Sequence, residues 1–259
     1  MVNISIDLNK TVEQNAGIYY EKAKKSKKKT EGARAALEES RRHLIMLEKQ
    51  REKEIKVEET KKDIKREWYE KFRWFFSSEN FLCIGGRDAT TNEIIIKKHT
   101  EKNDIVFHTD LAGSPFFIIK TENKKPKEAT LREVADATVS FSRVWKLGMQ
   151  SSPVFWVTPD QVSKEPQSGE YLPKGAFMIY GKTNYIENHI NCAIGMLEDG
   201  RMMAGPIEAV KVHCKKTVQL EQGRERASAI AKYIQKVVGG EIDEIIKVLP
   251  SGGCKIKKT

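Results

Sequence analysis

A long stretch without proline limits what this chain can fold into. Between Lys10 and Arg66 there is no proline, and Gly17 and Gly32 are the only glycines. Lysine, glutamate, alanine and arginine dominate the stretch, and all four are good helix formers. We therefore predict one long helix over residues 10–66, whose roughly 50 residues would span on the order of 75 Å at about 1.5 Å per residue.

Apolar residues recur along this helix at a spacing that favours a partner helix. Polar Ser40 and Arg51 interrupt the stripe, which is formed by Ala33, Leu37, Leu44, Leu47, Ile55 and Ile64. Because such a helix is poorly stable alone, we expect a coiled-coil partner helix, from a missing N-terminal part of the protein or from a second copy. The apolar face is too thin to favour a helix lying on a membrane.

The charge of the chain points to an acidic partner. Its 259 residues carry a formal net charge of +10. The predicted helix holds 18 basic and 11 acidic residues, so most of the excess lies there. Nucleic acid, the ribosome or an anionic membrane would each attract such a surface, and a merely solvated surface is the alternative. No apolar run reaches the roughly 20 residues of a membrane helix and no signal peptide opens the chain, so we predict a cytoplasmic protein without a membrane partner.

The cysteines do not form a recognisable metal or redox motif. No CxxC pair occurs among Cys83, Cys192, Cys214 and Cys254, and the five histidines are scattered. We expect the cysteines to be small core residues in a reducing compartment, and we expect no metal and no cofactor.

Beyond Trp68 the pattern changes to short strands, turns and helices. Strands are predicted at 81–84, 93–99, 104–109, 116–120, 154–158, 176–180 and, interrupted by a turn at 198–201, within 191–216. Helices are predicted from a capping box at Thr130 and Glu133 to a stop at Gly148, and over 223–238, with a short helix or strand before 249. The fold class is therefore α+β: a long N-terminal coiled-coil helix followed by a mainly antiparallel sheet domain with flanking helices.

The turn at Gly86 is the first candidate binding spot. A glycine lets the backbone approach a phosphate, which the adjacent Arg87 could grip with two hydrogen bonds, with Asp88 and Asn92 close by in sequence. The alternative is an ordinary turn in which Asp88 hydrogen-bonds its own backbone.

A strand end that carries His108 and Asp110 is the second candidate. In an extended strand the two side chains point to the same face, where they could do acid–base chemistry or form a structural pair. The following loop, which ends at Ser114, could bind an anion through its backbone N–H groups or be a simple hairpin loop.

Basic residues near aromatic neighbours are the third candidate, because stacking combined with phosphate contact suits RNA. They are Arg73, Lys97, Lys98, Arg143, Lys164, Lys174 and Lys182. A charged surface without a ligand is equally available to them. No P-loop, GxSxG, HExxH or GxGxxG motif is present, so we predict no enzymatic activity and no catalytic residue.

Several segments resemble one family closely. They are WYEKFRWF from Trp68, DIVFHTDLAGS from Asp104, LREVADATVSFSRVWKLG from Leu131 and GEYLPKGAFMI from Gly169. The chain resembles the NFACT family, of the archaeal and eukaryotic branch, and its NFACT-R domain. The resemblance implies a coiled-coil arm over 1–67 and an RNA-binding domain over 68–259, in which 187–259 is a C-terminal extension. Pro115 stands where many bacterial members have histidine, which argues against proton transfer by that loop.

The resemblance also implies a function. Family members act in ribosome-associated quality control: they bind the large ribosomal subunit obstructed by peptidyl-tRNA and help to position tRNA for C-terminal tailing of stalled chains. The implied partners are rRNA of the large subunit and tRNA, and the chain is expected to be a fragment of a longer protein or a short standalone member. Two other hypotheses stay open: a coiled-coil scaffold that binds proteins, and a nucleic-acid-processing enzyme that uses His108 and Asp110.

Overall fold

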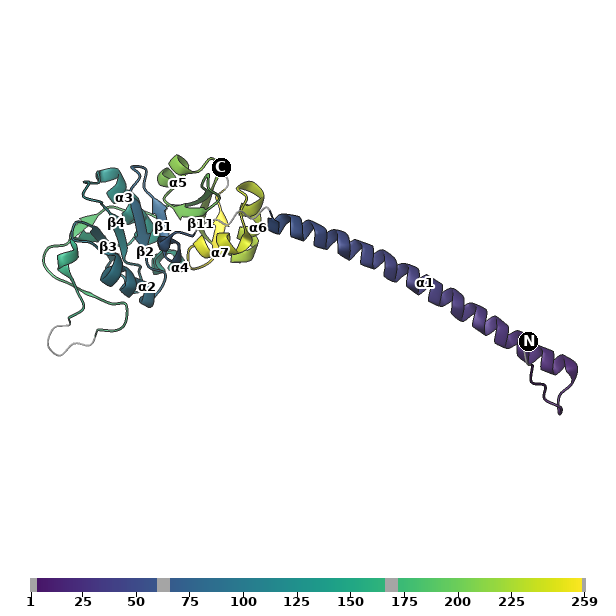
Figure 1. Cartoon of the computed structure of the whole chain (residues 1–259). Helices are drawn as coiled ribbons and strands as arrows, with labels where there is room; N and C mark the ends of the chain where they lie inside the picture. Colours follow the sequence, from purple (N-terminus) through teal and green to yellow (C-terminus); the bar gives the residue numbers. More distant parts are fainter. Residues whose placement is uncertain (1–3, 60–65, 166–171, 258–259) are drawn as a thin grey trace. The chain divides into compact units, whose positions relative to one another are not determined.

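The computed structural model describes residues 4–59, 66–165 and 172–257, with side chains left out at 49, 50 and 52–59. The chain divides into two compact units, residues 1–63 and residues 64–259. Figure 1 shows the course of the chain in each unit. Among the described residues no helix is long and apolar enough to cross a membrane.

The first unit is built on the helix α1 (Val12–Glu59). Thr11 caps its start, since the Thr11 hydroxyl accepts from the Gln14 N–H at 3.2 Å, and the buried Asn15 amide binds the Asp7 carbonyl at 3.0 Å. The predicted helix is therefore confirmed over its described length. Residues 60–65, with Ile64, lie outside the described residues, as does the side chain of Ile55.

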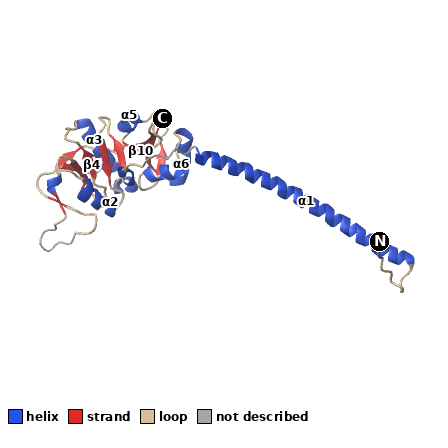
Figure 2. Ribbon diagram, viewed as in Figure 1, coloured by secondary structure: helices blue, strands red, loops and turns tan. Residues whose placement is uncertain are grey.

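The second unit contains a six-stranded sheet in which every neighbouring pair is antiparallel (Figure 2). In sheet order its strands are β1 (Arg73–Phe76), β2 (Leu82–Gly85), β4 (Phe117–Lys120), β3 (Ile105–Thr109), β5 (Val154–Val157) and β8 (Asn184–Ile186). A separate hairpin pairs β6 (Val162–Ser163) with β7 (Met178–Ile179).

Helices cover both faces of this sheet. Figure 1 shows α3 (Glu128–Ser140) on one side of β2 to β4 and α2 (Ala89–Ile94) on the other. The helix α2 continues into a π-helix, η2 (Ile95–His99). Two 3₁₀ turns, η1 (Trp68–Lys71) and η3 (Pro159–Gln161), precede β1 and follow β5, and α4 (Arg143–Leu147) follows α3.

A second sheet completes the unit. Its four antiparallel strands, in sheet order, are β10 (Met202–Gly205), β9 (Cys192–Met196), β11 (Thr217–Glu225) and β12 (Cys254–Ile256). It is accompanied by α5 (Ile207–His213), α6 (Ala227–Val237) and α7 (Ile242–Val248). The predicted α+β class with a mainly antiparallel sheet is confirmed.

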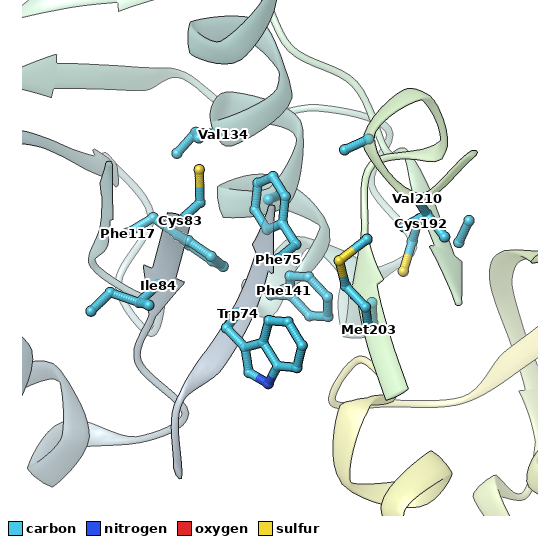
Figure 3. Close-up of a cluster of buried hydrophobic side chains, with 14 of the residues drawn as sticks. Trp74, Phe75, Cys83, Ile84, Phe117, Val134, Phe141, Cys192, Met203 and Val210 are labelled. Carbon is cyan, nitrogen blue, oxygen red and sulfur yellow. The ribbon is translucent and has the colours of Figure 1, made fainter. Parts of the chain in front are cut away.

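One hydrophobic core joins the two sheets. Figure 3 shows Phe75 of β1 between Phe117 of β4 and Met203 of β10, with Phe141 beside it. All four side chains are buried. Gly205 lies so close to Phe75 that a Cβ at that position would come within 2.9 Å of the ring. The buried Cys83 and Cys192 belong to the same core.

The predicted strand over Glu93–His99 is wrong, because the segment is the end of α2 and all of η2. The consecutive Ile94, Ile95 and Ile96 favour a strand by their β-branched side chains. Helix formation wins because Asp88 caps α2 and because Ile95 is fully buried on the helical segment.

The predicted capping box at Thr130 is also wrong, because α3 begins at Glu128. The helix start is capped from a distant turn instead. The Glu79 carboxylate accepts from the Lys127 N–H at 3.1 Å and from the Thr130 hydroxyl at 2.6 Å, while Glu133 accepts from the Ser78 N–H at 2.9 Å.

Two further predictions about helices need correction. The helix predicted to run to Leu147 is broken at Phe141, where Ser142 caps a new helix, α4, although its stop at Gly148 is confirmed by a left-handed residue with φ 73°. The strand predicted over 191–216 includes a helix, α5, after Pro206.

The C-terminal elements also differ in part. Residues 223–225 belong to β11 rather than to the predicted helix, which begins at Ala227. A Cβ at Gly223 would come within 2.6 Å of the Cys254 backbone, so this glycine permits close strand pairing rather than starting a helix.

Candidate nucleic-acid interface

Arg73 lies inside the domain. Its side chain points from β1 toward the segment after α7, where it donates to the Leu249 carbonyl at 3.1 Å and to the Ser251 hydroxyl at 3.0 Å. The guanidinium also lies 4.5 Å from the centre of the Phe141 ring. Burial, and secondarily the charge of Arg87, lowers the pKa of Arg73 to about 10. Arg73 therefore joins β1 to the segment after α7 by hydrogen bonds inside the domain.

Arg87 is held in a similar way. Its guanidinium donates to the Lys247 carbonyl at 2.6 Å and to the Phe72 carbonyl at 2.9 Å. Its buried Nε has no hydrogen-bond partner among the described residues. Burial lowers the pKa of Arg87. Because both terminal nitrogens bind backbone carbonyls, the side chain is occupied within the domain.

Asp88 and Asn92 organise the start of α2. The Asp88 carboxylate accepts from the Thr91 N–H at 2.8 Å, which makes Asp88 the helix cap. The buried Asn92 amide accepts from the Phe116 N–H at 3.1 Å. A Cβ at Gly86 would meet this amide at 1.7 Å, so glycine is needed there to admit Asn92.

His108 and Asp110 do not form a hydrogen-bonded pair among the described residues. The His108 ring stacks on Phe116 at 4.1 Å, and burial lowers the pKa of His108. The Asp110 carboxylate accepts from the Tyr185 hydroxyl at 3.3 Å. Burial thus disfavours the charged form of His108, and its ring packs in an aromatic row, an arrangement that favours packing over proton transfer.

The loop after β3 is closed by its own hydroxyl groups. The buried Ser114 hydroxyl donates to the Leu111 carbonyl at 2.9 Å and also contacts the Thr109 hydroxyl. Gly113, with φ 88°, lies beside the aliphatic part of Arg143 at the start of α4, where a Cβ would come within 3.6 Å. Arg143 is exposed and its guanidinium has no hydrogen bond or ion pair to a described residue, so it supplies positive charge beside this loop.

The adjacent residues Lys97 and Lys98 lie on η2. Lys97 forms an ion pair with Glu93 at 2.6 Å, whereas Lys98 is exposed with no such pair within the described part of the chain. Lys120, at the end of β4, donates to the His99 carbonyl at 3.0 Å. The end of the π-helix is therefore bonded to Lys120, the last residue of β4, while the loop beside Arg143 leads into the first residue, Phe117.

Lys164 and Lys182 lie on the segment between β5 and β8, which contains the hairpin of β6 and β7. Lys164 donates to the carbonyls of Pro173 at 3.0 Å and Ala176 at 2.9 Å, and lies 5.1 Å from the Phe177 ring centre. Lys164 therefore links the end of β6 to the residues before β7. The side chain of Lys182 is exposed, and the Lys182 carbonyl accepts from the Gln161 amide at 2.9 Å.

The twelve predicted positions described above therefore divide into two kinds. Most are engaged within the domain by the contacts above. The three with exposed cationic groups and no partner among the described residues are Lys98, Arg143 and Lys182. The sequence predicts Arg73 as an RNA contact, but Arg73 and its neighbour Trp74 are both buried. Trp68, which is 44% exposed, is not among the predicted contacts. The aromatic residues of 68–76 indicate a ring-rich segment, but composition does not show which of these rings is exposed.

The described residues offer no group of three or more His, Cys, Asp or Glu side chains that could hold a metal ion. The four cysteines are buried and free. Burial raises the pKa of Cys192 well above its usual value and raises that of Cys254 to about 11. These thiols are therefore packing groups in the core.

Comparison with known proteins places this geometry in a family context. A family model described as the NFACT protein RNA binding domain matches residues 71–181. "Archaeal Rqc2 homolog aRqcH" of Methanocaldococcus jannaschii is 43% identical over 207 residues, which cover 76% of this chain and 31% of that protein. "Ribosome quality control complex subunit NEMF homolog" of Drosophila melanogaster is 37% identical over 203 residues, which cover 75% of this chain and 20% of that protein.

The chain thus spans less than a third of the length of these two relatives. Among solved structures, the C-terminal part of the fibronectin/fibrinogen-binding protein from Streptococcus suis aligns with 69% of this chain and 77% of that one, at 18% identity. The TM-score of 0.38 is too low to support an argument about this chain.

Proposed function

Because the chain is a member of the NFACT family, we propose that it is the RNA-binding module of a ribosome-associated quality-control factor. In this proposal it binds the large ribosomal subunit obstructed by peptidyl-tRNA and helps to position tRNA for C-terminal tailing of the stalled chain. The observation that carries the proposal is the match of residues 71–181 to an RNA-binding domain model, in a chain similar to proteins named as ribosome quality-control factors.

The surface chemistry supports this proposal. The net charge of +10 favours binding to a polyanion. Lys98, Arg143 and Lys182 offer exposed cations that no described acidic residue neutralises. We propose these three as phosphate contacts to rRNA or tRNA, and we leave Arg73 and Arg87 out because their donors are taken up within the domain.

The proposal gives the helical arm and the following domain separate roles. We propose that residues 1–67 act as a coiled-coil arm and residues 68–259 as the RNA-binding domain, with 187–259 as its C-terminal extension. A cytoplasmic location follows from a role on the ribosome and stays a prediction.

We also propose that the module is not itself catalytic. The separate engagement of His108 by Phe116 and of Asp110 by Tyr185 supports this view. Positioning of tRNA is then the contribution of the protein, and bond formation that of the ribosome.

Binding of labelled tRNA to the full chain, followed by fluorescence anisotropy across a salt series, tests the proposed contacts. Exchange of Lys98, Arg143 and Lys182 for glutamate should weaken binding at least about tenfold and flatten the salt dependence. The matched control exchanges the exposed Lys124, Lys232 and Lys236 for glutamate, which changes the net charge equally. Equal weakening by both triple variants would show that only net charge matters.

A scaffold function has separate support from α1. Its described stripe residues Leu37, Leu44 and Leu47 are each more than half exposed, and exposed leucines at helical spacing favour pairing with another helix. A scaffold would bind its partner protein at high salt, whereas RNA binding should decline as salt rises.

A further inference from the structure

A stacked aromatic pair, the exposed Trp68 on the half-buried His99, lies where the 3₁₀ turn η1 meets the π-helix η2. The rings of Trp68 and His99 are stacked, with centres 4.5 Å apart and planes 15° from parallel. Tyr69 and Phe72 approach the indole edge-to-face at 5.7 Å and 6.4 Å. With 44% of its surface exposed, Trp68 presents indole surface to solvent on a support of three rings.

This exposure sets Trp68 apart from the other tryptophans. Trp74 and Trp145 are 5% and 1% exposed, and Trp156 is only partly exposed in β5. The exposed part of the Trp68 indole is available to a ligand, whereas the rings of Trp74 and Trp145 are not.

The support beneath Trp68 is rigidly held. His99 is the last residue of η2, where Lys120 donates to its carbonyl at 3.0 Å and the Thr100 hydroxyl donates to the Ile95 carbonyl at 3.0 Å. The Phe72 ring lies against the edge of His99 at 5.3 Å. The imidazole is thus fixed from its backbone and from its edge, which pre-organises the stack.

Cations surround the pair. Desolvation, followed by the charges of Lys71, Lys120 and Lys98, lowers the pKa of His99. Lys120 is neutralised by Asp104 at 2.5 Å and Glu101 at 2.9 Å. Lys71 and Lys98 are exposed, and neither forms an ion pair with a described residue.

Nearby acidic groups have other partners. Glu93 is paired with Lys97 at 2.6 Å, and the Glu70 carboxylate accepts from the Glu67 N–H at 2.8 Å. Lys71 and Lys98 thus offer two ammonium groups, without an ion-pair partner among the described residues, that act on the His99 ring beneath the indole and can bind an anionic ligand with a flat ring.

We propose that Trp68, supported by His99, is a stacking platform for an unpaired base of single-stranded RNA, whose flanking phosphates bind Lys71 and Lys98. Stacking needs a base that is not enclosed in a duplex, and aromatic rings with adjacent cations are the usual means of binding such bases. The inference rests on the proposed function and deepens it by naming unpaired RNA as the ligand. Arg143 and Lys182, which the proposed function also uses, are not part of this platform.

Tryptophan fluorescence of the full chain tests this platform directly. An oligouridylate of about eight nucleotides should quench the emission and bind with a salt-dependent affinity, whereas an RNA duplex of the same length should bind more weakly. Trp68→Leu, which retains an apolar side chain without a ring, should weaken binding about tenfold. Trp68→Phe should restore most of the affinity but not the quenching.

Salt dependence separates the two components. Trp68→Leu and His99→Leu should weaken binding without changing its salt slope, because neither ring contacts a phosphate. Lys98→Ala should lower the slope by about 0.7, the value for one phosphate contact on a single strand. The matched controls are Tyr233→Ala, an aromatic residue 50% exposed on α6, and Lys232→Ala beside it, which should both bind as the wild type does. Thermal unfolding of each variant identifies any that fails to fold.

The outcomes distinguish this inference from the proposed function. If Trp68→Leu and His99→Leu both fold and bind the oligonucleotide as the wild type does, the platform is wrong, while tRNA binding through Arg143 and Lys182 stands. Equal affinity of the wild type for duplex and single strand would likewise overturn it. If the wild-type chain binds neither the oligonucleotide nor tRNA, the proposed function fails as well.

Discussion

At the residue scale, the arginines show how burial decides between a structural and a binding role. Arg73 and Arg143 are both close to tryptophans in sequence, and the sequence allows both to contact a phosphate. In the structure, Arg73 is 7% exposed and its donors bind Leu249 and Ser251. Arg143 is exposed beside Gly113. Sequence alone cannot separate them, because the partners of Arg73 lie about 180 residues away in the chain.

Replacement of Arg73 by methionine should destabilise the domain. The variant lacks the hydrogen bonds from a charged donor and the packing of the guanidinium on the Phe141 ring, so we expect the free energy of unfolding to fall by about 3 kcal/mol. Chemical denaturation measures this decrease. Arg143→Ala is the matched control and should stay within about 0.5 kcal/mol of the wild type. Similar stability of the two variants would contradict the assigned role of Arg73.

His108 should make stability depend on pH. Its pKa is lowered in the folded state from its usual value of 6.5, mainly by burial. As the pH falls through 6.5 the unfolded chain takes up a proton that the folded chain does not, so the free energy of unfolding should fall. His99 acts in the same direction. His108→Gln should reduce the decrease in stability measured by denaturation between about pH 7.5 and about pH 5. An unchanged pH dependence in this variant would show that His108 is not the group responsible.

At the scale of elements, local signals predicted β2, β3, β4 and β5 of the six-stranded sheet, but not its two edge strands, β1 and β8. The strand expected at 104–109 is confirmed as β3, because alternation and flanking turns act locally. The strand expected at 93–99 is wrong because the cap at Asp88 and the burial of Ile95 outweigh the β-branched run. The cap of α3 could not be predicted, since Glu79 comes from a turn about 50 residues earlier.

This tertiary cap leads to a prediction about α3. Glu79→Ala should lower the free energy of unfolding by about 1 kcal/mol, because the Lys127 N–H and the Thr130 hydroxyl would then lack their acceptor. Glu79→Gln retains an acceptor oxygen and should recover part of this stability. The matched control, Glu128→Ala, removes an exposed carboxylate of the first turn that pairs only with Arg132, at 2.6 Å, among the described residues, and should cost less. A larger destabilisation by Glu128→Ala would contradict the cap at Glu79.

At the scale of the whole molecule, the sequence predicts the helical arm better than the binding surface. The predicted helix was recognisable from composition alone, because 57 residues without proline leave few alternatives. Composition could not show which charges of the second unit are free, since that depends on contacts between distant segments. The same limit applies to the candidate site: residue types indicated RNA, and the fold selected the exposed cations.

The lysines near the start of α1 should contribute to RNA affinity without specificity. Lys24, Lys25, Lys27, Lys28 and Lys29 are all exposed. Their replacement by glutamine, a comparable helix former, should leave the circular dichroism of the helix nearly unchanged. It should lower the salt slope of tRNA binding by about 0.7 to 0.9 for each phosphate that the helix no longer neutralises. An unchanged slope would show that α1 does not bind RNA in the complex.

Co-sedimentation of the full chain with purified large ribosomal subunits, with and without bound peptidyl-tRNA, across a salt series, tests the central claim most directly. Our account predicts binding that prefers the subunit carrying peptidyl-tRNA and that declines steeply as salt rises. Absence of binding at low salt, or equal binding to both subunits that persists at high salt, would contradict the proposal that this chain reads RNA on an obstructed ribosome.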